Sequence, residues 1–442
     1  MKKLVLAFLL LSTIVVGQVT VPPVCFNYLS NITTASVGIN PYSITNADFN
    51  VDGQQDLATA NFTSNNVSVL AGLGGGVFTP AVNYPVGTNP CSIKNSDFNN
   101  DGKLDLVTAN KGSNNVSILF GTAPGSFTTA VNYPVGTAPN CVFVGDFNND
   151  GNKDLVTANY NSNNISVLLG SPTGVFSAAI NYSLGINPHS VIAADFNTDG
   201  NLDIAVTNIN SNNVYVLLGN GTGNFPSSTI FVNTFGVNFS GPLVSIDING
   251  DGKLDIITAN GSSNSGVSVF SGNGLGGFTF TSLTAAAGYP SDIIIADFNG
   301  DSKIDIATLY AHSDIGILLG NGSGVFTLNG YYFSGPNPQS FLTTDLNGDS
   351  KLDFAITNRS SNKVSIVFGV GNGSFLTATV FNPDYGNFQG ICTGDFNADG
   401  KLDIATAEDA GDKVAVHLGN GGGQFGPAIS HMWTMSSGDL VT

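Results

Sequence analysis

The sequence contains few of the residues that build long helices and basic binding surfaces. Among its 442 residues there is one Glu (Glu408), one Arg (Arg359) and one Trp, and charged residues make up only 10%. This composition argues against coiled coils and nucleic-acid-binding proteins, which are rich in charged side chains. The net charge of −18 argues against nucleic acid and anionic membranes as partners.

The acidic residues that are present are almost all aspartate, with 30 Asp beside the single Glu. Surface solubility alone would use both carboxylates, so some feature of this chain requires the shorter one. A hydrophobic content of 42% argues against disorder. A chain of this length is too long for one ordinary core, which predicts two or three domains or one repeat array.

The N-terminus has the pattern of a secretory signal peptide. Lys2 and Lys3 precede an apolar run from Leu4 to Val16, and small residues allow cleavage after Gly17. The run is shorter than the roughly 20 apolar residues of a membrane span, which disfavours a membrane anchor. We therefore expect residues 1–17 to be removed and the mature protein to be secreted or held at the cell surface, without a membrane span.

Four cysteines in an exported chain permit two disulfides in three connectivities. Free buried thiols are the main expectation; if a disulfide forms, Cys91 and Cys141 are the favoured pair, because they stand at nearly the same place in consecutive repeats.

A nine-residue acidic motif, Asp-x-Asn-x-Asp-Gly-x-x-Asp, occurs eight times at intervals of 48 to 52 residues, with Ser in place of Gly in two copies. A Gly-x-Phe or Gly-Phe signal recurs with the same period. Repeats of this length predict one array of similar units rather than separate domains. The array covers residues 37–432, between an N-terminal segment at 18–36 and a C-terminal tail at 433–442. The motif starts at Asp48, Asp97, Asp146, Asp195, Asp247, Asp297, Asp345 and Asp395.

Each repeat has the alternation typical of strands, and no segment has helical periodicity. In the second repeat we expect a first strand leading from Ser92 to the acidic motif, then strands at 104–108, 116–120 and 127–133. Four short antiparallel strands per repeat predict an all-β propeller, most simply with eight blades and alternatively with seven.

Two segments compete to complete the last blade. Residues 31–41 look like the end of a fourth strand followed by a crossover, and residues 425–433 look like a fourth strand as well. One of the two is surplus, so the N-terminal segment is a candidate ring-closing strand.

The acidic motif places oxygen donors at positions 1, 3, 5 and 9, with a backbone carbonyl at position 7. Hard oxygen ligands on a short loop with a sharp turn at position 6 suit Ca²⁺, so we expect up to eight calcium ions. The last carboxylate stands at position 9 rather than 12 and no helices flank the loop, which excludes an EF-hand. The predicted metal ligands are Asp48, Asn50, Asp52, Asp56, Asp97, Asn99, Asp101, Asp105, Asp146, Asn148, Asp150, Asp154, Asp195, Asn197, Asp199, Asp203, Asp247, Asn249, Asp251, Asp255, Asp297, Asn299, Asp301, Asp305, Asp345, Asn347, Asp349, Asp353, Asp395, Asn397, Asp399 and Asp403.

The alternative is that Asp, Asn and Gly only form turns here. Turn formation does not explain why the eight copies hold 24 of the 30 aspartates. Ser302 and Ser350 replace the glycine at position 6, so their two loops are the less certain metal sites.

The repeats resemble the FG-GAP/VCBS repeats of integrin α-subunit heads and of many exported bacterial proteins. The resemblance rests on strings such as Asp195-Phe-Asn-Thr-Asp-Gly-Asn-Leu-Asp203 and Leu217-Leu-Gly-Asn-Gly-Thr-Gly-Asn-Phe225, and it covers essentially the whole mature chain. It implies a calcium-loaded β-propeller with ions between the first and second strands of each blade. The fold hosts lectins, adhesins and some polysaccharide-degrading enzymes, so the resemblance implies little about activity. Integrin heads have seven blades and fewer metal loops, so eight intact motifs depart from them.

No motif for catalysis is present: the four histidines have no metal-binding spacing, and few acids lie outside the loops. The sixth repeat departs most from the others, since it reads Thr-Leu-Tyr-Ala-His-Ser-Asp between its second and third strands, and Asp292 lies in the crossover before it. Neutral drift explains such departures, but residues that form a ligand pocket would also depart from the repeat. The candidate ligand-binding residues are Tyr310, His312 and Asp314, with Arg359 in the corresponding turn of the seventh repeat.

Together these patterns predict an exported, non-enzymatic calcium-binding propeller that binds an extracellular glycan or protein in adhesion or recognition. The alternatives are a polysaccharide hydrolase or lyase on the same scaffold and a structural module of a larger surface protein. Tyr84, Tyr133 and Tyr182 recur before the crossovers, either as an aromatic platform for a glycan or as caps of the fourth strands.

Overall fold

The fold is seen in a computed structural model of the chain. The structure describes residues 34–73, 78–122, 125–232, 239–261, 266–285, 290–310, 313–336, 338–345, 349–358, 363–376, 379–381, 388–408 and 413–426. All of them belong to one compact unit, Asn31–Thr442.

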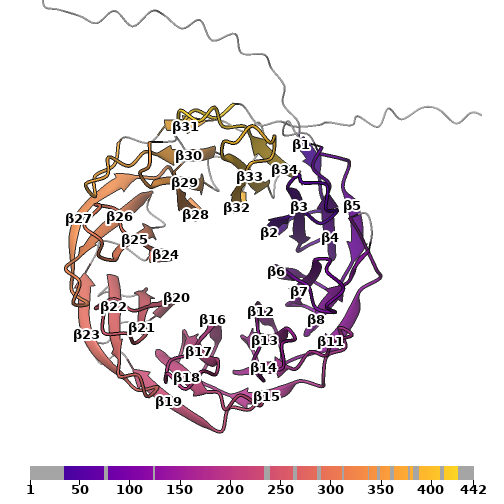
Figure 1. Cartoon of the computed structure of the whole chain (residues 1–442), viewed down its shortest axis with the longest axis horizontal. Helices are drawn as coiled ribbons and strands as arrows, with labels where there is room; N and C mark the ends of the chain where they lie inside the picture. Colours follow the sequence, from indigo (N-terminus) through magenta and orange to yellow (C-terminus); the bar gives the residue numbers. More distant parts are fainter. Residues whose placement is uncertain are drawn as a thin grey trace, which may run out of the picture. The chain divides into compact units, whose positions relative to one another are not determined.

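The described residues form strands and no helix, and the strands make eight four-stranded antiparallel sheets placed around a ring (Figure 1). The prediction of an all-β propeller with four-stranded antiparallel blades is therefore confirmed. In seven sheets the strands come from one continuous stretch of chain, and in the eighth one strand comes from the other end of the chain.

We number the blades 1 to 8 along the chain. Blade 1 contains β2 (Pro41–Ala47), β3 (Asp56–Asn61), β4 (Asn66–Leu70) and β5 (Val82–Pro85); blade 2 contains β6 (Pro90–Ser96), β7 (Asp105–Asn110), β8 (Asn115–Leu119) and β11 (Val131–Pro134), with the short ribbon β9 (Gly121–Thr122) and β10 (Ser126–Phe127) between the last two; blade 3 contains β12 (Pro139–Gly145), β13 (Asp154–Asn159), β14 (Asn164–Leu168) and β15 (Ile180–Ser183); blade 4 contains β16 (Pro188–Ala194), β17 (Asp203–Asn208), β18 (Asn213–Leu218) and β19 (Ser227–Val232).

The second half of the ring follows the same plan. Blade 5 contains β20 (Phe239–Ile246), β21 (Asp255–Asn260), β22 (Gly266–Gly272) and β23 (Phe278–Ala285); blade 6 contains β24 (Pro290–Ala296), β25 (Asp305–Tyr310), β26 (Asp314–Gly320) and β27 (Phe326–Phe333); blade 7 contains β28 (Pro338–Thr344), β29 (Asp353–Asn358), β30 (Lys363–Val367) and β31 (Thr379–Phe381); blade 8 contains β32 (Phe388–Gly394), β33 (Asp403–Glu408), β34 (Lys413–His417) and β1 (Thr34–Ser36).

The second strand of a blade is its most buried element. In blade 2, β7 is buried at every residue, whereas the outer strand β11 leaves three of its four residues exposed. A strand paired on both sides and covered on both faces must be apolar or internally hydrogen-bonded along its whole length, and the Asp-Leu-Val-Thr-Ala-Asn sequence of β7 meets this need.

The hydrophobic core lies between neighbouring blades rather than inside each one. Phe98 and Val107 of blade 2, for example, pack in one cluster with Val142, Leu155 and Leu168 of blade 3. Burial of apolar side chains therefore joins each blade to the next, so that a single repeat has no core of its own.

The ring is closed by the N-terminal strand, as the sequence suggested. β1 pairs antiparallel with β34, where Ala35 lies opposite Val414. Val37, which follows β1, packs in one cluster with Phe396 of blade 8 and Leu57 of blade 1. In the competing C-terminal segment, Phe425 forms an isolated bridge with Gly419, and residues 427–433 lie outside the described part of the chain.

Cys91, Cys141 and Cys392 are free thiols, as mainly expected from the sequence, and the less favoured Cys91–Cys141 disulfide is not formed. The thiol of Cys91 lies 3.3 Å from the carbonyl oxygen of Pro139, while that of Cys141 lies 3.4 Å from the carbonyl oxygen of His189. Each thiol thus contacts a backbone carbonyl of the next blade. Cys25 lies outside the described residues.

Across the described ranges, the search for a helix that is long and apolar enough to cross a membrane finds none.

Candidate metal-binding loops

Each acidic motif forms the loop between the first and second strands of its blade, and we call it acidic loop 1 to 8 after the blade. The first carboxylate follows the end of the first strand, and the last carboxylate is the first residue of the second strand, as with Asp97 and Asp105 around β6 and β7. The eight loops therefore occupy the same end of every blade.

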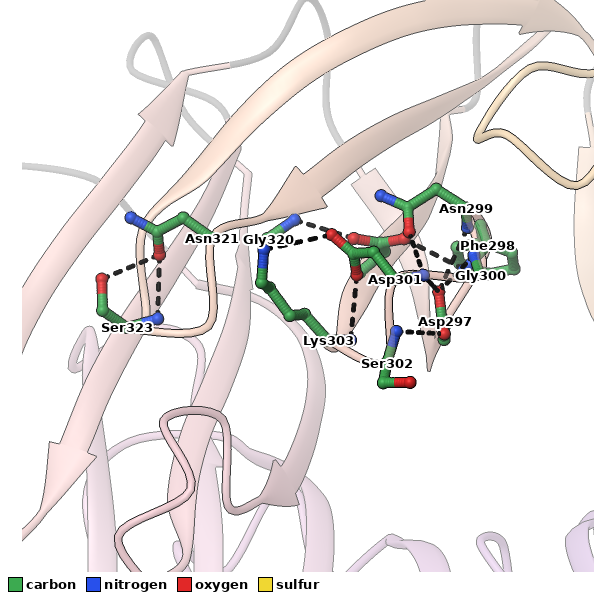
Figure 2. A network of polar contacts seen from close by, with 11 residues as sticks. Asp297, Phe298, Asn299, Gly300, Asp301, Ser302, Lys303, Gly320, Asn321 and Ser323 are labelled. Carbon is green, nitrogen blue, oxygen red and sulfur yellow. Dashed lines mark hydrogen bonds and ion pairs between the residues drawn. The ribbon is translucent and has the colours of Figure 1, made fainter.

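The carboxylate at position 1 folds the loop around itself. In loop 6, Asp297 Oδ1 accepts hydrogen bonds from the backbone N–H groups of Gly300 (2.7 Å) and Asp301 (3.2 Å), and Oδ2 accepts one from Ser302 (2.7 Å) (Figure 2). In all eight loops the position-5 amide donates to Oδ1 of the position-1 residue at 3.1–3.2 Å, and the position-6 amide donates to its Oδ2 at 2.7–2.9 Å.

The side-chain oxygens of positions 1 and 3 converge. In loop 4, the backbone N–H of Asp199 donates to Asp195 Oδ1 at 3.1 Å and to Asn197 Oδ1 at 3.0 Å, so the two oxygens lie at the same nitrogen. Asp199 in turn accepts the amide of Asn201 at 2.8 Å. Short Asp and Asn side chains suit this arrangement because they bond to backbone groups two residues further on.

The backbone conformation explains why glycine or serine occupies position 6 of the loop, and it indicates strain at position 4. Ser302 (φ 64°) and Ser350 (φ 63°) adopt the same left-handed conformation as the glycines that they replace, and they make the same hydrogen bond to position 1. Position 4 is also left-handed, and in loops 1 and 4 it holds the β-branched residues Val51 (φ 60°) and Thr198 (φ 59°). Such residues are unfavourable there, so the loop imposes this conformation on them.

The carboxylate at position 9 is fully buried and joins the loop to the connection between the third and fourth strands. Asp154 Oδ2 accepts the amide of Phe147 at 2.8 Å, and its Oδ1 accepts the amide of Gly170 at 2.7 Å. Burial, and secondarily the neighbouring Asp150 and Asp146, raise the pKa of Asp154 to about 6. The pKa of Asp56, Asp105, Asp203 and Asp403 is raised to the same value, with burial again the largest cause.

The donor set has the all-oxygen chemistry that hard divalent cations require, with half-buried side chains at positions 1 and 3, an exposed carboxylate at position 5 and a buried carboxylate at position 9. Among the described residues, no three His, Cys, Asp or Glu side chains already form a metal-binding group. This agrees with the observation that the position-9 carboxylate points at two backbone amides and that position 3 is an amide, not an acid.

Sequence reasoning overlooked the residue at position 7. It is Lys in five loops, and the ammonium pairs with the position-5 carboxylate of the same loop at 2.9–3.4 Å, as between Lys103 and Asp101. Loops 1, 3 and 4 have Gln54, Asn152 and Asn201 instead. Comparing the eight motifs position by position would have revealed this division.

The structure does not support Tyr310 as a ligand-binding residue. Its side chain is only 1% exposed, and its ring packs against Tyr331 at a centroid distance of 5.8 Å. It occupies space left by Gly316, whose Cβ would stand 2.8 Å from the Tyr310 ring. Tyr310 and Gly316 are therefore a packing pair, in which the large side chain fills the space that the glycine leaves.

The other candidate ligand-binding residues differ in their positions. Asp314 begins β26 and is half-buried, whereas His312 and Arg359 lie outside the described residues. Asp292 belongs to the first strand of blade 6, not to the crossover before it, and burial raises its pKa to about 6.

The recurring tyrosines fasten one blade to the next. The hydroxyl of Tyr84 accepts the amide of Phe127 at 3.2 Å, and the two rings meet edge to face at 5.5 Å. Tyr133 and Tyr182 do the same with Phe176 and Phe225. Their rings are therefore occupied at interfaces between blades and do not form a free aromatic platform.

The sequence was compared with known families and proteins. The family described as FG-GAP-like repeat matches residues 97–157, 146–206, 195–258, 247–308 and 345–406, which together make up more than half of the chain. No curated protein matches the sequence.

Solved structures show the same fold at low sequence identity. Sqt1 from Chaetomium thermophilum superposes with a TM-score of 0.61 at 12% identity, covering 88% of this chain and 99% of that one. A protein from Lactobacillus plantarum gives 0.51 at 15% identity, covering 79% and 96%.

Proposed function

Because the chain belongs to the FG-GAP-like repeat family, we propose that it is an exported, calcium-binding β-propeller that acts as a non-enzymatic binding module. The observation that carries the proposal is the repetition of one oxygen-lined loop at the same end of each blade, with the same internal hydrogen bonds. Selection for turns alone would tolerate many loop sequences, whereas a cation requires the same donors at the same positions each time.

The ions would be held by the side chains at positions 1, 3, 5 and 9 of each acidic loop, together with the carbonyl at position 7. Calcium would supply positive charge beside the carboxylates that each loop carries. The chain itself holds the donors in place: position 1 gathers the amides of positions 5 and 6, and position 9 anchors the loop to the following connection, as Asp154 does through Gly170. Stabilisation would follow by mass action, since the unfolded chain has no such site.

The ligand of the module would be an extracellular glycan or protein. Support for a non-enzymatic role is the absence from the sequence of a nucleophile motif and the small number of acids outside the loops. The chain departs from its repeat pattern on the face formed by crossovers and by the turns between second and third strands, so ligand contact belongs there, with Asp314, His312 and Arg359 as the remaining candidates.

Two measurements test this proposal. Calcium added to chelator-treated protein should raise the melting temperature strongly, while magnesium should restore it poorly, because its smaller octahedral shell suits these loops less well. Glycan-array and protein-capture binding should then be compared in calcium and in excess EDTA. A melting temperature that is the same in both would refute calcium binding, and turnover of a polysaccharide would refute the non-enzymatic role.

A further inference from the structure

Two acidic loops in neighbouring blades are joined by a side-chain bridge. Asn149, at position 4 of loop 3, donates from Nδ2 to Asn201 Oδ1 at position 7 of loop 4, with a distance of 2.6 Å. Asn201 then donates from Nδ2 to Asp199 Oδ1 at 2.8 Å. A continuous path of hydrogen bonds thus runs from one loop to the position-5 carboxylate of the next.

The same bridge links loops 2 and 3. Asn100 donates to Asn152 Oδ1 at 2.8 Å, and the side chain of Asn152 hydrogen-bonds to Asp150, at position 5 of loop 3. Asn152 is buried, with 5% of its surface exposed, so this amide is not a solvated surface group. Loops 2, 3 and 4 therefore form a connected series.

A glycine covers the second bridge closely. Gly221, in the connection between the third and fourth strands of blade 4, has φ 69°, and a Cβ there would stand 2.2 Å from Asn201 Oδ1 and 2.9 Å from Asn149 Nδ2. The backbone thus approaches the two amides as no other residue type would allow.

Within the described part of the chain, this amide bridge joins only loops 2, 3 and 4. In the other loops with described contacts at position 7, lysine pairs with position 5 of its own loop, as Lys253 does with Asp251 at 3.4 Å. The position-4 residues that precede the lysine loops carry no side-chain amide; they are Val51, Thr198, Gly250, Gly300 and Gly348.

We propose that cation binding is coupled across loops 2, 3 and 4 through the bridges Asn100–Asn152 and Asn149–Asn201, and that the lysine-bearing loops 5 to 8 bind independently. The inference rests on the proposed calcium binding. A cation in loop 3 fixes the backbone at Asn149, so that its amide holds Asn201 and, through it, the Asp199 carboxylate in place for a cation in loop 4. Coupling of this kind is reciprocal, so loss of loop 3 weakens loops 2 and 4 alike.

The test counts bound calcium per chain by equilibrium dialysis, at a free calcium concentration near the wild-type midpoint. Asp150→Ala removes a donor of loop 3, and coupling predicts a loss greater than one site, because the affinities of loops 2 and 4 fall about fivefold or more. In an Asn100→Gly, Asn149→Gly background, the same Asp150→Ala change should remove only its own site. Glycine is suitable because position 4 is already Gly in loops 5 and 6, with φ 74° and 76°.

Matched variants separate coupling from folding. Val51→Gly changes position 4 of loop 1, which has no bridge, and Asp251→Ala removes a donor in the unbridged loop 5; the first should leave calcium occupancy unchanged and the second should remove one site. The bridge variants should broaden the calcium titration while melting in EDTA like Val51→Gly. Equal losses for Asp150→Ala with and without the bridges would overturn the coupling and leave calcium binding intact. A wild-type chain that binds no calcium would overturn both.

Discussion

The carboxylate of Asp154 and the backbone amide of Gly170 are 2.7 Å apart and fully buried, which joins an acidic loop to a turn that lies 16 residues further on. The equivalent contact occurs in all eight blades. Position 9 therefore has a structural role in the fold, in addition to the metal-binding role proposed for it.

Asp154→Ala should destabilise the protein even without metal. The change leaves the buried amides of Phe147 and Gly170 without an acceptor, and each such group costs about 1–3 kcal/mol. Asp150→Ala, at the exposed position 5 of the same loop, should cost less than about 1 kcal/mol in EDTA. Urea unfolding of both variants in EDTA measures the difference, and similar midpoints would contradict the role given to position 9.

Without calcium, stability should increase as the pH falls from 7.5 to 5. Burial raises the folded-state pKa of Asp56, Asp105, Asp154, Asp203 and Asp403 to about 6, above the ordinary value of 3.8, so protons bind the folded state preferentially. The stability that these carboxyls add to the folded state is fully present below their unfolded-state pKa and is lost as the pH rises through about 6. With calcium the dependence should reverse, because protons compete with the ion for the same carboxylates. Melting curves in EDTA and in calcium across this range provide the check, and parallel profiles would argue against it.

His417→Leu should stabilise the protein, most strongly in acid. The His417 side chain is buried in β34, and burial lowers its pKa to about 4. The stability of the folded state that depends on neutral His417 is therefore fully present above pH 6.5 and is lost as the pH falls through 4. Blades 1, 2 and 3 have leucine at the same register position, opposite the second residue of the second strand, at Leu70, Leu119 and Leu168. Melting temperatures of the variant and the wild type at pH 7.5 and 4.5 should differ most at the lower pH; an equal shift at both would exclude protonation as the cause.

Tyr133→Phe should weaken the joint between blades 2 and 3 without affecting ligand binding. It removes the acceptor of the Phe176 amide at 3.3 Å and keeps the edge-to-face ring contact, so a cost of about 0.5–1.5 kcal/mol is expected. Tyr133→Ala should cost more because the ring packing is lost too. Denaturant unfolding measures both, and glycan binding that falls in Tyr133→Phe would restore the aromatic-platform hypothesis.

The thiols should be unreactive in the folded protein. Burial raises the pKa of Cys91 to about 12, of Cys141 to about 11 and of Cys392 to about 12, so little thiolate forms near neutral pH. A thiol reagent should label all three only after denaturation in the absence of reductant. Failure to label Cys91 and Cys141 in denaturant without reductant would show that they are disulfide-bonded.

The repeat made most of the fold predictable. The second-repeat strands expected at 104–108 and 116–120 correspond to β7 and β8 within one or two residues, because a buried strand must show its apolar run in the sequence. The expected strand at 127–133 was less accurate: it is divided between β10 and β11, since Phe127 pairs with Gly121 and the outer strand starts only at Val131.

The candidate ligand residues were harder to judge from the sequence. Departure from the repeat marks a change, but it does not say whether the new side chain faces solvent. Tyr310 departs because Gly316 across the sheet leaves room for its ring, a relation between two strands that no single repeat position reveals.

The sequence by itself determined the strand pattern, the number of acidic loops and the donor type at each loop position, because these depend on local periodicity and on the reach of short side chains. Only the tertiary structure decided which side chains meet between blades. The bridge from Asn149 to Asn201 spans 52 residues, the thiols of Cys91 and Cys141 contact carbonyl oxygens of the next blade, and the ring closes through β1 at the far end of the chain. These contacts depend on how each blade is set against its neighbour, and that arrangement is fixed by the apolar packing of whole sheets rather than by any local pattern.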